Sequence, residues 1–330
     1  PNGKTTVPHL AADILRRAGR VAAEAGNVET PLVEAIDDAT VEVFVVEASS
    51  FRLGHTAHWA PEVAAWLNFA PDHLDVHADL AAYEAAKARI WVDQGPADVA
   101  VVNADDPVVA GHGGQARRRT FGFAGGESAT VRDGWLVIDD RRLLGVDDLR
   151  RSLRHDQANA LAAALMVEPL GVDDGAIAAA LAAFDGLPHR VQRIGESDGV
   201  AWYDDSKATT PHATRAAVEA FDSVVLIAGG RNKGLDLSDL LGRRGSVRAV
   251  VAIGEAAPDV VDAVAGRVPV ATAPTMVEAV EEADALARPG DAVVLSPGCA
   301  SFDWYSSYGE RGDDFTRLVR IHLDQEASRP

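Results

Sequence analysis

Short runs of β-branched residues alternate along the chain with longer alanine-rich stretches, and this alternation limits the possible folds more than any other feature. Residues 41–47 (VEVFVVE) are the clearest predicted strand, and residues 99–103 (VAVVN) are another. Between them, residues 80–92 place apolar side chains at helical spacing. Repeated strand–helix–strand units predict an α/β protein with a mostly parallel sheet covered by helices.

The 330-residue length and a break near residue 186 predict two domains. Gly186 and Pro188 interrupt the helical pattern directly after two predicted helices, at residues 156–170 and 173–184. We therefore place a first domain at residues 1–186 and a smaller α/β domain at residues 187–330. The second domain is predicted to contain strands near residues 191, 201–204, 224–228, 249–253 and 292–295, and a final helix at 313–324.

The helical pattern also disappears between residues 111 and 140. Asp133-Gly134 and Asp139-Asp140 lie between short alternating runs, as residues of hairpin turns do, and predict an antiparallel extension of the first domain. The basic run Arg117-Arg118-Arg119 is interpreted as a solvated turn rather than a ligand-binding patch.

The composition disfavours several kinds of partner. Lys and Arg number 31 against 50 Asp and Glu, a formal net charge of -19, whereas nucleic acids and anionic membranes are bound by clustered basic residues. No apolar run reaches the length of a membrane span, and we expect no leader segment. The single cysteine, Cys299, cannot form an internal disulfide. We interpret it as a buried structural thiol in a cytoplasmic protein.

The first residues form the second half of a phosphate-binding loop. In Asn2-Gly3-Lys4-Thr5-Thr6, followed by a predicted helix, backbone N–H groups could hold phosphates, Lys4 supplies a cation and a hydroxyl could reach Mg²⁺. The complete motif also needs a glycine four residues before Gly3 and a strand that leads into the loop. Neither is found in the sequence as given. Gly-Lys-Thr also occurs by chance, so a terminus without a binding role is the alternative at this stage.

Metal-ligand candidates follow two further strands. Glu47 ends the strand at residues 41–47, at the sheet edge where open α/β sheets bind ligands. Asp72-His73-Leu74-Asp75 follows another apolar run, and oxygen ligands with one imidazole suit Mg²⁺ or Mn²⁺. A solvated carboxylate and a hydrogen-bonded histidine are the alternatives, and Lys87 would by itself be interpreted as a surface lysine.

Three glycine-rich or hydroxyl-rich segments follow strands of the second domain, at residues 204–209 (DDSKAT), 229–234 (GGRNKG) and 296–303 (SPGCASFD). Because the carboxyl ends of parallel strands meet at one edge, we expect these loops to converge. The glycines lack the GxGxxG spacing of a dinucleotide fingerprint, so NAD is not inferred.

Taken in order, these segments resemble the Mur ligases of peptidoglycan synthesis, in particular their D-glutamate-adding members. The resemblance runs from residue 1 to about residue 322. It is carried by NGKTT (2–6), GN (26–27), the E-x-SSF strand end (47–51), DHLD (72–75), AAKARI (85–90), NADD (103–106), NALAA (159–163), GLPHR (186–190), DSKAT (205–209), GG-x-x-KG (229–234) and SPGCASFD (296–303). DSKAT sets the D-glutamate-adding branch apart within this family.

The resemblance implies a P-loop ATPase-like central domain, a Rossmann-like second domain and an ATP-dependent amide ligase. Such an enzyme adds D-glutamate to UDP-N-acetylmuramoyl-L-alanine through an acyl phosphate, in cell-wall synthesis. The family has a further N-terminal UDP-binding domain, so we expect the chain to be a fragment. A non-catalytic fragment that binds ATP or D-glutamate, and a related amino-acid ligase such as folylpolyglutamate synthase, are the alternatives.

The resemblance also implies roles for individual residues. Catalysis would involve Lys4, His73, Lys87 and Arg190, with Lys87 carbamylated. Two Mg²⁺ ions would be held by Thr5, Glu47, His73 and the modified Lys87. ATP would be bound by Asn2, Gly3, Lys4, Thr5, Thr6, Asn159, Arg190, Asp205 and Lys207. Substrate would be bound by Asn27, Thr209, Lys233, Ser301, Phe302 and Tyr308.

Three positions depart from the family pattern. Asp156 and Thr210 stand where asparagine is frequent, and Arg231 stands where an acidic residue is frequent. The contacts of this protein with the nucleotide base and with D-glutamate therefore do not follow in detail from the resemblance. The family resemblance otherwise predicts a monomer whose partners are small molecules, without nucleic acid or membrane.

Overall fold

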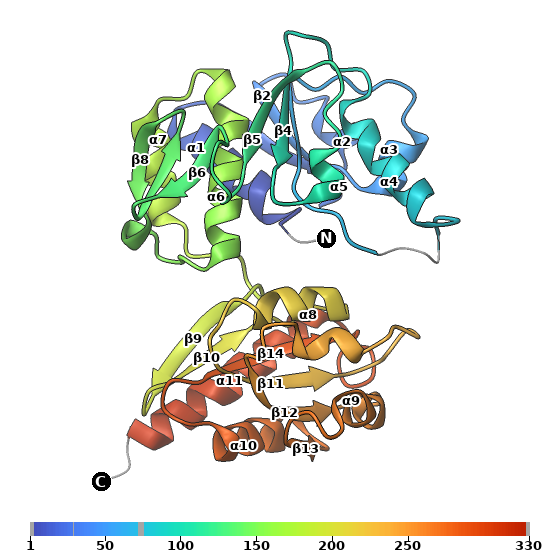
Figure 1. The fold of residues 1–330 in the computed structure, drawn as a ribbon, viewed down its shortest axis with the longest axis vertical. Helices are drawn as coiled ribbons and strands as arrows, with labels where there is room; N and C mark the ends of the chain where they lie inside the picture. Colours follow the sequence, from blue (N-terminus) through green and yellow to red (C-terminus); the bar gives the residue numbers. More distant parts are fainter. Residues whose placement is uncertain (1–2, 29, 72–75, 328–330) are drawn as a thin grey trace. The chain divides into compact units, whose positions relative to one another are not determined.

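The chain divides into two units, Pro1–Asp185 (unit 1, blue to yellow-green) and Gly186–Pro330 (unit 2, yellow to red) (Figure 1). The computed structural model describes residues 3–28, 30–71 and 76–327. The roles predicted for Asn2 and for residues 72–75, including His73, concern positions outside the described residues. Within the described residues, no helix is both long and apolar enough to cross a membrane.

Unit 1 contains a parallel strand pair and a six-stranded sheet. The pair is β1 (Ala22–Gly26) and β2 (Val43–Glu47). The sheet has the order β3-β4-β5-β6-β7-β8, parallel from β3 to β6 and antiparallel beyond. Its strands are β3 (Val63–Trp66), β4 (Val99–Asn103), β5 (Arg117–Phe121), β6 (Ala129–Arg132), β7 (Trp135–Ile138) and β8 (Arg141–Gly145).

Helices cover both faces of the unit 1 sheet because its strands are apolar on both faces. Helices α1 (Thr6–Arg17), α6 (Arg154–Val167) and α7 (Asp174–Ala183) form the larger core with the strands. On the other face, Trp66 and Trp91 pack with small strand residues. The remaining helices are α2 (Leu32–Ala35), α3 (Ser50–His55), α4 (Leu80–Ala88) and α5 (Pro107–Ala110).

The hairpin prediction is confirmed, but the interpretation of the basic run is wrong. Asp133 and Asp139 have positive φ at the two predicted turns, which join antiparallel β6, β7 and β8. Arg117–Phe121 is not a turn but strand β5, paired with β4. Arg119 is 9% exposed and its charge is compensated by Asp139 at 2.7 Å and Glu168 at 3.0 Å.

Unit 2 is a doubly wound sheet with the order β13-β12-β11-β14-β10-β9, in which only the β9–β10 pair is antiparallel. Its strands are β9 (Gln192–Ser197), β10 (Val200–Asp204), β11 (Val224–Gly229), β12 (Val247–Ile253), β13 (Val270–Ala273) and β14 (Ala292–Gly298). Its helices are α8 (Pro211–Val218), α9 (Ala257–Val264), α10 (Met276–Leu286) and α11 (Tyr308–Ala327).

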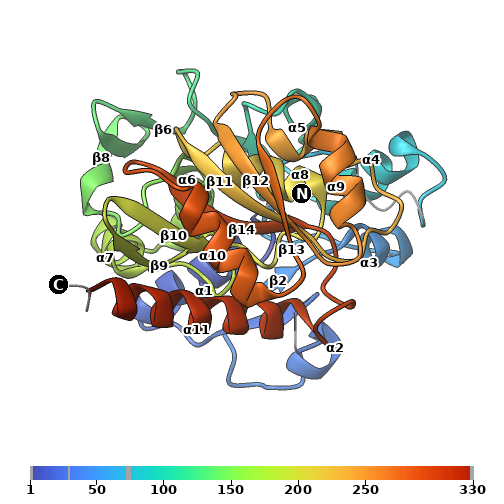
Figure 2. The same ribbon diagram turned by 90° about the horizontal axis from the view of Figure 1, so that it is seen from below.

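Alternate residues of the central strand β11 point to opposite faces of the sheet, and a layer of helices covers each face. Val225 and Ile227 of β11 point into the core formed with α10 and α11. Val224, Leu226 and Ala228 point into the core formed with α8 and α9. In Figure 2, α10 and α11 lie next to each other along the sheet. The predicted α/β class is confirmed for both units.

Candidate functional site

The start of α1 in unit 1 has the geometry of an anion-binding helix terminus. Gly3 has φ +83°, and a Cβ there would lie 2.6 Å from Asn159 Oδ1. The left-handed backbone conformation favours glycine here, and an added Cβ would also press on the Asn159 side chain. The described part of α1 has neither a side-chain cap nor an acidic residue in its first turn. The partial positive charge of the helix terminus is therefore not neutralised locally.

Glu47 ends β2 as predicted and is 5% exposed. Its Oε1 accepts a hydrogen bond of 3.0 Å from Asn27 Nδ2, and the Asn27 backbone N–H donates to the Glu47 carbonyl oxygen at 2.8 Å. Within the described residues, Glu47 Oε2 has no hydrogen-bond partner. A buried carboxylate oxygen without a partner is costly and is a natural ligand for a hard cation.

Lys87 is not the surface lysine that its position alone suggests, since it is only 9% exposed. It lies on α4, and its Nζ is 5.2 Å from the centre of the Tyr83 ring. His77 was not predicted from the sequence. Its Nε2 lies 3.0 Å from Ser50 Oγ, and its ring stacks on the Phe51 ring at a centroid distance of 5.6 Å. No sequence signal distinguished His77 from any other loop histidine.

A cavity of about 190 Å³ brings three predicted residues together. Its polar lining includes Lys4, Glu47, Asn68 and Lys87. Most of its remaining lining is apolar and comes from α1, from the neighbouring edges of β2 and β3, and from α6. Glu47 ends β2 and Asn68 lies just beyond the carboxyl end of β3, the end of a parallel strand at which α/β proteins bind ligands.

The prediction that the three strand-end loops of unit 2 converge is confirmed. Arg231 and Ala300 form an antiparallel bridge with N–H···O distances of 2.8 and 3.0 Å, which joins the loops after β11 and β14. The Gly298 N–H donates to the Ala208 carbonyl at 2.9 Å and joins the loop after β10 to that after β14. A Cβ on Gly230 would overlap the Ala300 carbonyl, so the close approach requires glycine.

Arg311, which the sequence analysis missed, ties two of these loops together. Its side chain is 1% exposed and donates to Ser206 Oγ and to the Ser206 carbonyl, both at 2.9 Å, and to the Cys299 carbonyl at 3.2 Å. Burial lowers the pKa of Arg311 to about 10, so the guanidinium remains charged at neutral pH. Its partners lie far away in sequence, so no local pattern identifies it.

Asp204 ends β10 and Asp205 follows directly after it, and the two carboxyl groups have different environments. Asp204 Oδ2 is 2.6 Å from His189 Nδ1, and this hydrogen bond raises the pKa of His189. Asp205 accepts from Ser296 Oγ at 2.7 Å and from the Val191 N–H at 3.2 Å. Burial raises the pKa of Asp205 to about 7, although both hydrogen bonds oppose that shift. Asp205 therefore changes charge close to neutral pH.

The predicted substrate residues of unit 2 differ in exposure. Ser301 is 2% exposed, whereas Phe302 is 57% exposed and Tyr308 is 37% exposed. Lys207 Nζ lies 3.6 Å from the centre of the Tyr308 ring, a cation–π contact. The remaining predicted positions are Arg190 and Thr209, which are partly buried, and Lys233, which is exposed. Cys299 is 1% exposed and burial raises its pKa, as expected of a structural thiol.

The departures Asp156 and Arg231 both form ion pairs. Asp156 lies 3.2 Å from an Arg151 nitrogen. Arg231 donates to both Glu255 carboxylate oxygens at 2.9 and 2.8 Å. The charge at Arg231 is therefore compensated by Glu255 rather than left open to a ligand.

A helix N-terminus that follows a glycine in one unit and joined strand-end loops in the other are common ligand-binding features of α/β proteins. Residues 1–140 match the Mur ligase middle domain, and residues 189–299 match the Mur ligase glutamate ligase domain. The chain belongs to the Mur ligase family.

Relatives refine this assignment. The chain is 43% identical over 333 residues to the UDP-N-acetylmuramoylalanine--D-glutamate ligase of Frankia casuarinae, with 97% of this chain and 70% of the relative covered. The MurF ligase of Thermotoga maritima, solved with ADP, has a TM-score of 0.71 at 18% identity, with 98% and 79% covered. A Yersinia pestis folylpolyglutamate synthase/dihydrofolate synthase, solved with AMPPNP and Mn, has a TM-score of 0.67 at 19% identity, with 98% and 87% covered. These two structures share the fold.

Proposed function

We propose that this protein is an ATP-dependent amide ligase that adds D-glutamate to UDP-N-acetylmuramoyl-L-alanine in peptidoglycan synthesis. The observation that carries the proposal is the 43% identity to a D-glutamate ligase along 97% of the chain. Residues 1–186 act as the ATP-binding domain, and residues 187–330 contribute to nucleotide and D-glutamate binding. The enzyme works in the cytoplasm as a monomer on small-molecule substrates.

The reaction has two steps whose atoms balance. A carboxylate oxygen of the L-alanine substrate attacks the γ-phosphorus of ATP, the bond to the β-phosphate oxygen breaks, and ADP leaves. The D-glutamate amine then attacks the acyl carbon, phosphate leaves and the amine loses a proton. Both steps are accelerated mainly by alignment and by compensation of negative charge.

In unit 1 the residues around the start of α1 hold the ATP phosphates. Gly3 allows the backbone to approach the phosphates closely, and the N–H groups of the first helical turn donate to them. Lys4 adds a mobile positive charge, and the Thr5 and Thr6 hydroxyls lie at the same helix start. Asn2 belongs to this group. Asn159, whose Oδ1 limits the space at Gly3, contacts the base side of the nucleotide.

The residues present fit a divalent cation, because the buried Glu47 Oε2 has no hydrogen-bond partner within the described residues. Glu47, Thr5, Lys87 and His73 are the proposed ligands of two Mg²⁺ ions. Magnesium bound there neutralises phosphate charge. Asn27 orients Glu47 through the 3.0 Å hydrogen bond to Oε1, and it also lies on the proposed path of the substrate.

Lys87 serves as a ligand after carbamylation by CO₂. The ammonium group first loses one proton, the free amine then forms an N–C bond with CO₂, and a second proton is released, so that a cation becomes an anion. The position of Lys87 supports this role, because it lines the same cavity as Glu47 and is only 9% exposed. We expect ¹³C-bicarbonate to produce a carbamate signal in NMR spectra of the protein. The signal should disappear in Lys87→Met and persist in the exposed-lysine control Lys233→Met. An unchanged signal in Lys87→Met would rule out this modification.

In unit 2 the joined strand-end loops bind the rest of the nucleotide and D-glutamate. Asp205 accepts from the ribose hydroxyls, while Arg190 and Lys207 neutralise phosphate charge. Thr209, Lys233, Ser301, Phe302 and Tyr308 surround D-glutamate, with Lys233 available to a carboxylate. Arg231 is already paired with Glu255, so it is not assigned to the substrate.

The test is phosphate release from ATP in the presence of UDP-N-acetylmuramoyl-L-alanine and one of D-glutamate, L-glutamate or meso-diaminopimelate. The 330-residue chain and the complete gene product are compared. Release that requires D-glutamate supports the proposal. Phosphate release only by the complete gene product would identify the 330-residue chain as a binding fragment. Phosphate release that requires a folate substrate would instead identify a folylpolyglutamate synthase.

A further inference from the structure

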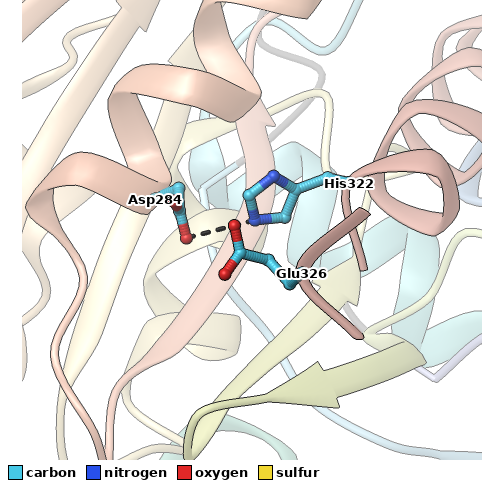
Figure 3. A group of neighbouring side chains, drawn as sticks. All are labelled: Asp284, His322 and Glu326. Atoms are coloured by element: carbon cyan, nitrogen blue, oxygen red, sulfur yellow. Dashed lines mark ion pairs between the residues drawn. The ribbon is translucent and has the colours of Figure 1, made fainter. Parts of the chain in front are cut away.

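Asp284, His322 and Glu326 form a cluster of potential metal ligands in unit 2, apart from the strand-end loops. Their ligand atoms all lie within 4.8 Å of one another. His322 and Glu326 are one helical turn apart on α11, and Asp284 comes from the neighbouring α10. Figure 3 shows the three side chains turned toward one another. The Trp202 ring, 5.4 Å from the His322 ring, packs against the histidine and limits its movement.

Electrostatics favour a cation at this point. Asp284 lies in the last turn of α10 and Glu326 in the last turn of α11, where helix termini carry partial negative charge. Neither helix has a basic residue in its last turn. Two carboxylates thus lie beside the negative ends of two helices.

The distance between two of the ligand atoms matches that expected around a coordinated ion. His322 Nε2 and Asp284 Oδ1 are 3.2 Å apart, and their side chains are 17% and 42% exposed. Two ligands bound tetrahedrally at about 2.1 Å stand roughly 3.4 Å from each other. One imidazole with two carboxylates is a ligand set that binds Zn²⁺ and related first-row divalent ions.

We propose that Asp284, His322 and Glu326 bind a divalent transition-metal ion of the zinc class, with water completing its coordination. The ion ties the end of α11 to α10. Tyr308 begins α11 at the strand-end loops, and fourteen residues of helix separate it from His322, which is about 21 Å. The site is therefore structural and independent of the magnesium proposed in unit 1.

Isothermal titration of the untagged full chain with Zn²⁺, in saturating Mg²⁺, tests the proposal. Asp284→Asn, His322→Gln and Glu326→Gln should each weaken one binding event by more than about 10-fold, since even outer partners of metal ligands contribute 10- to 100-fold. Glu281→Gln, an exposed position on α10, and His58→Gln, an exposed histidine of unit 1, are matched controls that should bind like the unaltered chain.

A second readout uses the nearby tryptophan. Ni²⁺ at this site should quench Trp202 fluorescence, and His322→Gln should lose that quenching while its circular dichroism remains unchanged. The competing explanation is an Asp284–His322 ion pair without a metal. If Zn²⁺ binding and Ni²⁺ quenching are the same in the unaltered chain and all three ligand variants, the metal site does not exist.

Discussion

The candidate sites of the two units differ in how completely their polar groups are paired. In unit 2, Arg311 and the Arg231–Ala300 bridge join the strand-end loops by hydrogen bonds within the protein. In unit 1, the buried Glu47 keeps one carboxylate oxygen without a partner within the described residues. Under the proposed function, the loops of unit 2 are preorganised, whereas the site of unit 1 would be completed by a bound cation and phosphates.

The largest effect should come from removing the charge at Glu47. We expect Glu47→Gln to lower the ligase rate of the complete gene product by about 100-fold or more, because a charge that balances the cation is lost. The free energy of unfolding should not fall, since Gln can still accept from Asn27. Glu34→Gln, an exposed change on α2, is the rate control. A Glu47→Gln enzyme that is destabilised but active would remove the contrast between the units.

Removal of the Arg311 side chain should instead affect stability. Arg311→Met leaves the buried Ser206 and Cys299 carbonyl groups without these donors, at a cost of about 2–5 kcal/mol in the free energy of unfolding. Urea denaturation measures this change. The matched variant Arg320→Met, at an exposed position of the same helix, should stay within about 0.5 kcal/mol of the unaltered chain. Equal stabilities of the two variants would show that the loops do not depend on Arg311.

Gly3→Ala should weaken ADP binding about 10-fold, because the new Cβ would press on Asn159 and displace the loop. Gly19→Ala is a close control, since Gly19 has nearly the same φ, +82°, but nothing lies within 4 Å of an added Cβ. Both variants should lose about 1 kcal/mol of stability from the backbone conformation. Calorimetry should find weaker ADP binding only for Gly3→Ala, and equal binding by the two would contradict the proposed loop.

The smallest effect concerns pH. The raised pKa of His189 means that its hydrogen bond to Asp204 contributes stability fully below the unfolded pKa of about 6.5. This contribution is lost as pH rises through the folded pKa. Between about pH 6 and 8, the unaltered chain should lose more stability than His189→Gln. The raised pKa of Asp205 acts in the same direction in both proteins, so the difference between them isolates His189. Parallel pH profiles would refute this role.

Local signals predicted much of the fold, and distant contacts account for most of what was missed. Apolar strand patterns predicted β4 and β11, and Asp133-Gly134 predicted a hairpin whose turn residues have positive φ. Strand β5 was missed because its arginines resemble a solvated turn, and the ion pairs of Arg119 are formed with residues from later elements.

In the candidate functional sites, too, local signals predicted some residues and distant contacts account for the others. Glu47 and the strand-end loops could be placed from sequence because strand ends define the ligand-binding edge of an α/β sheet. The roles of Arg311 and His77 depend on packing between segments that no short motif connects. The burial of Lys87 also follows from tertiary packing, and only the family resemblance indicated its importance.

The most direct test of the proposed function follows oxygen atoms. UDP-N-acetylmuramoyl-L-alanine with an ¹⁸O-labelled carboxylate is incubated with ATP, D-glutamate and the complete gene product. An acyl-phosphate ligase must transfer one labelled oxygen to the released phosphate, which mass spectrometry detects. Label in AMP, or amide formation with no label in phosphate, would contradict the account.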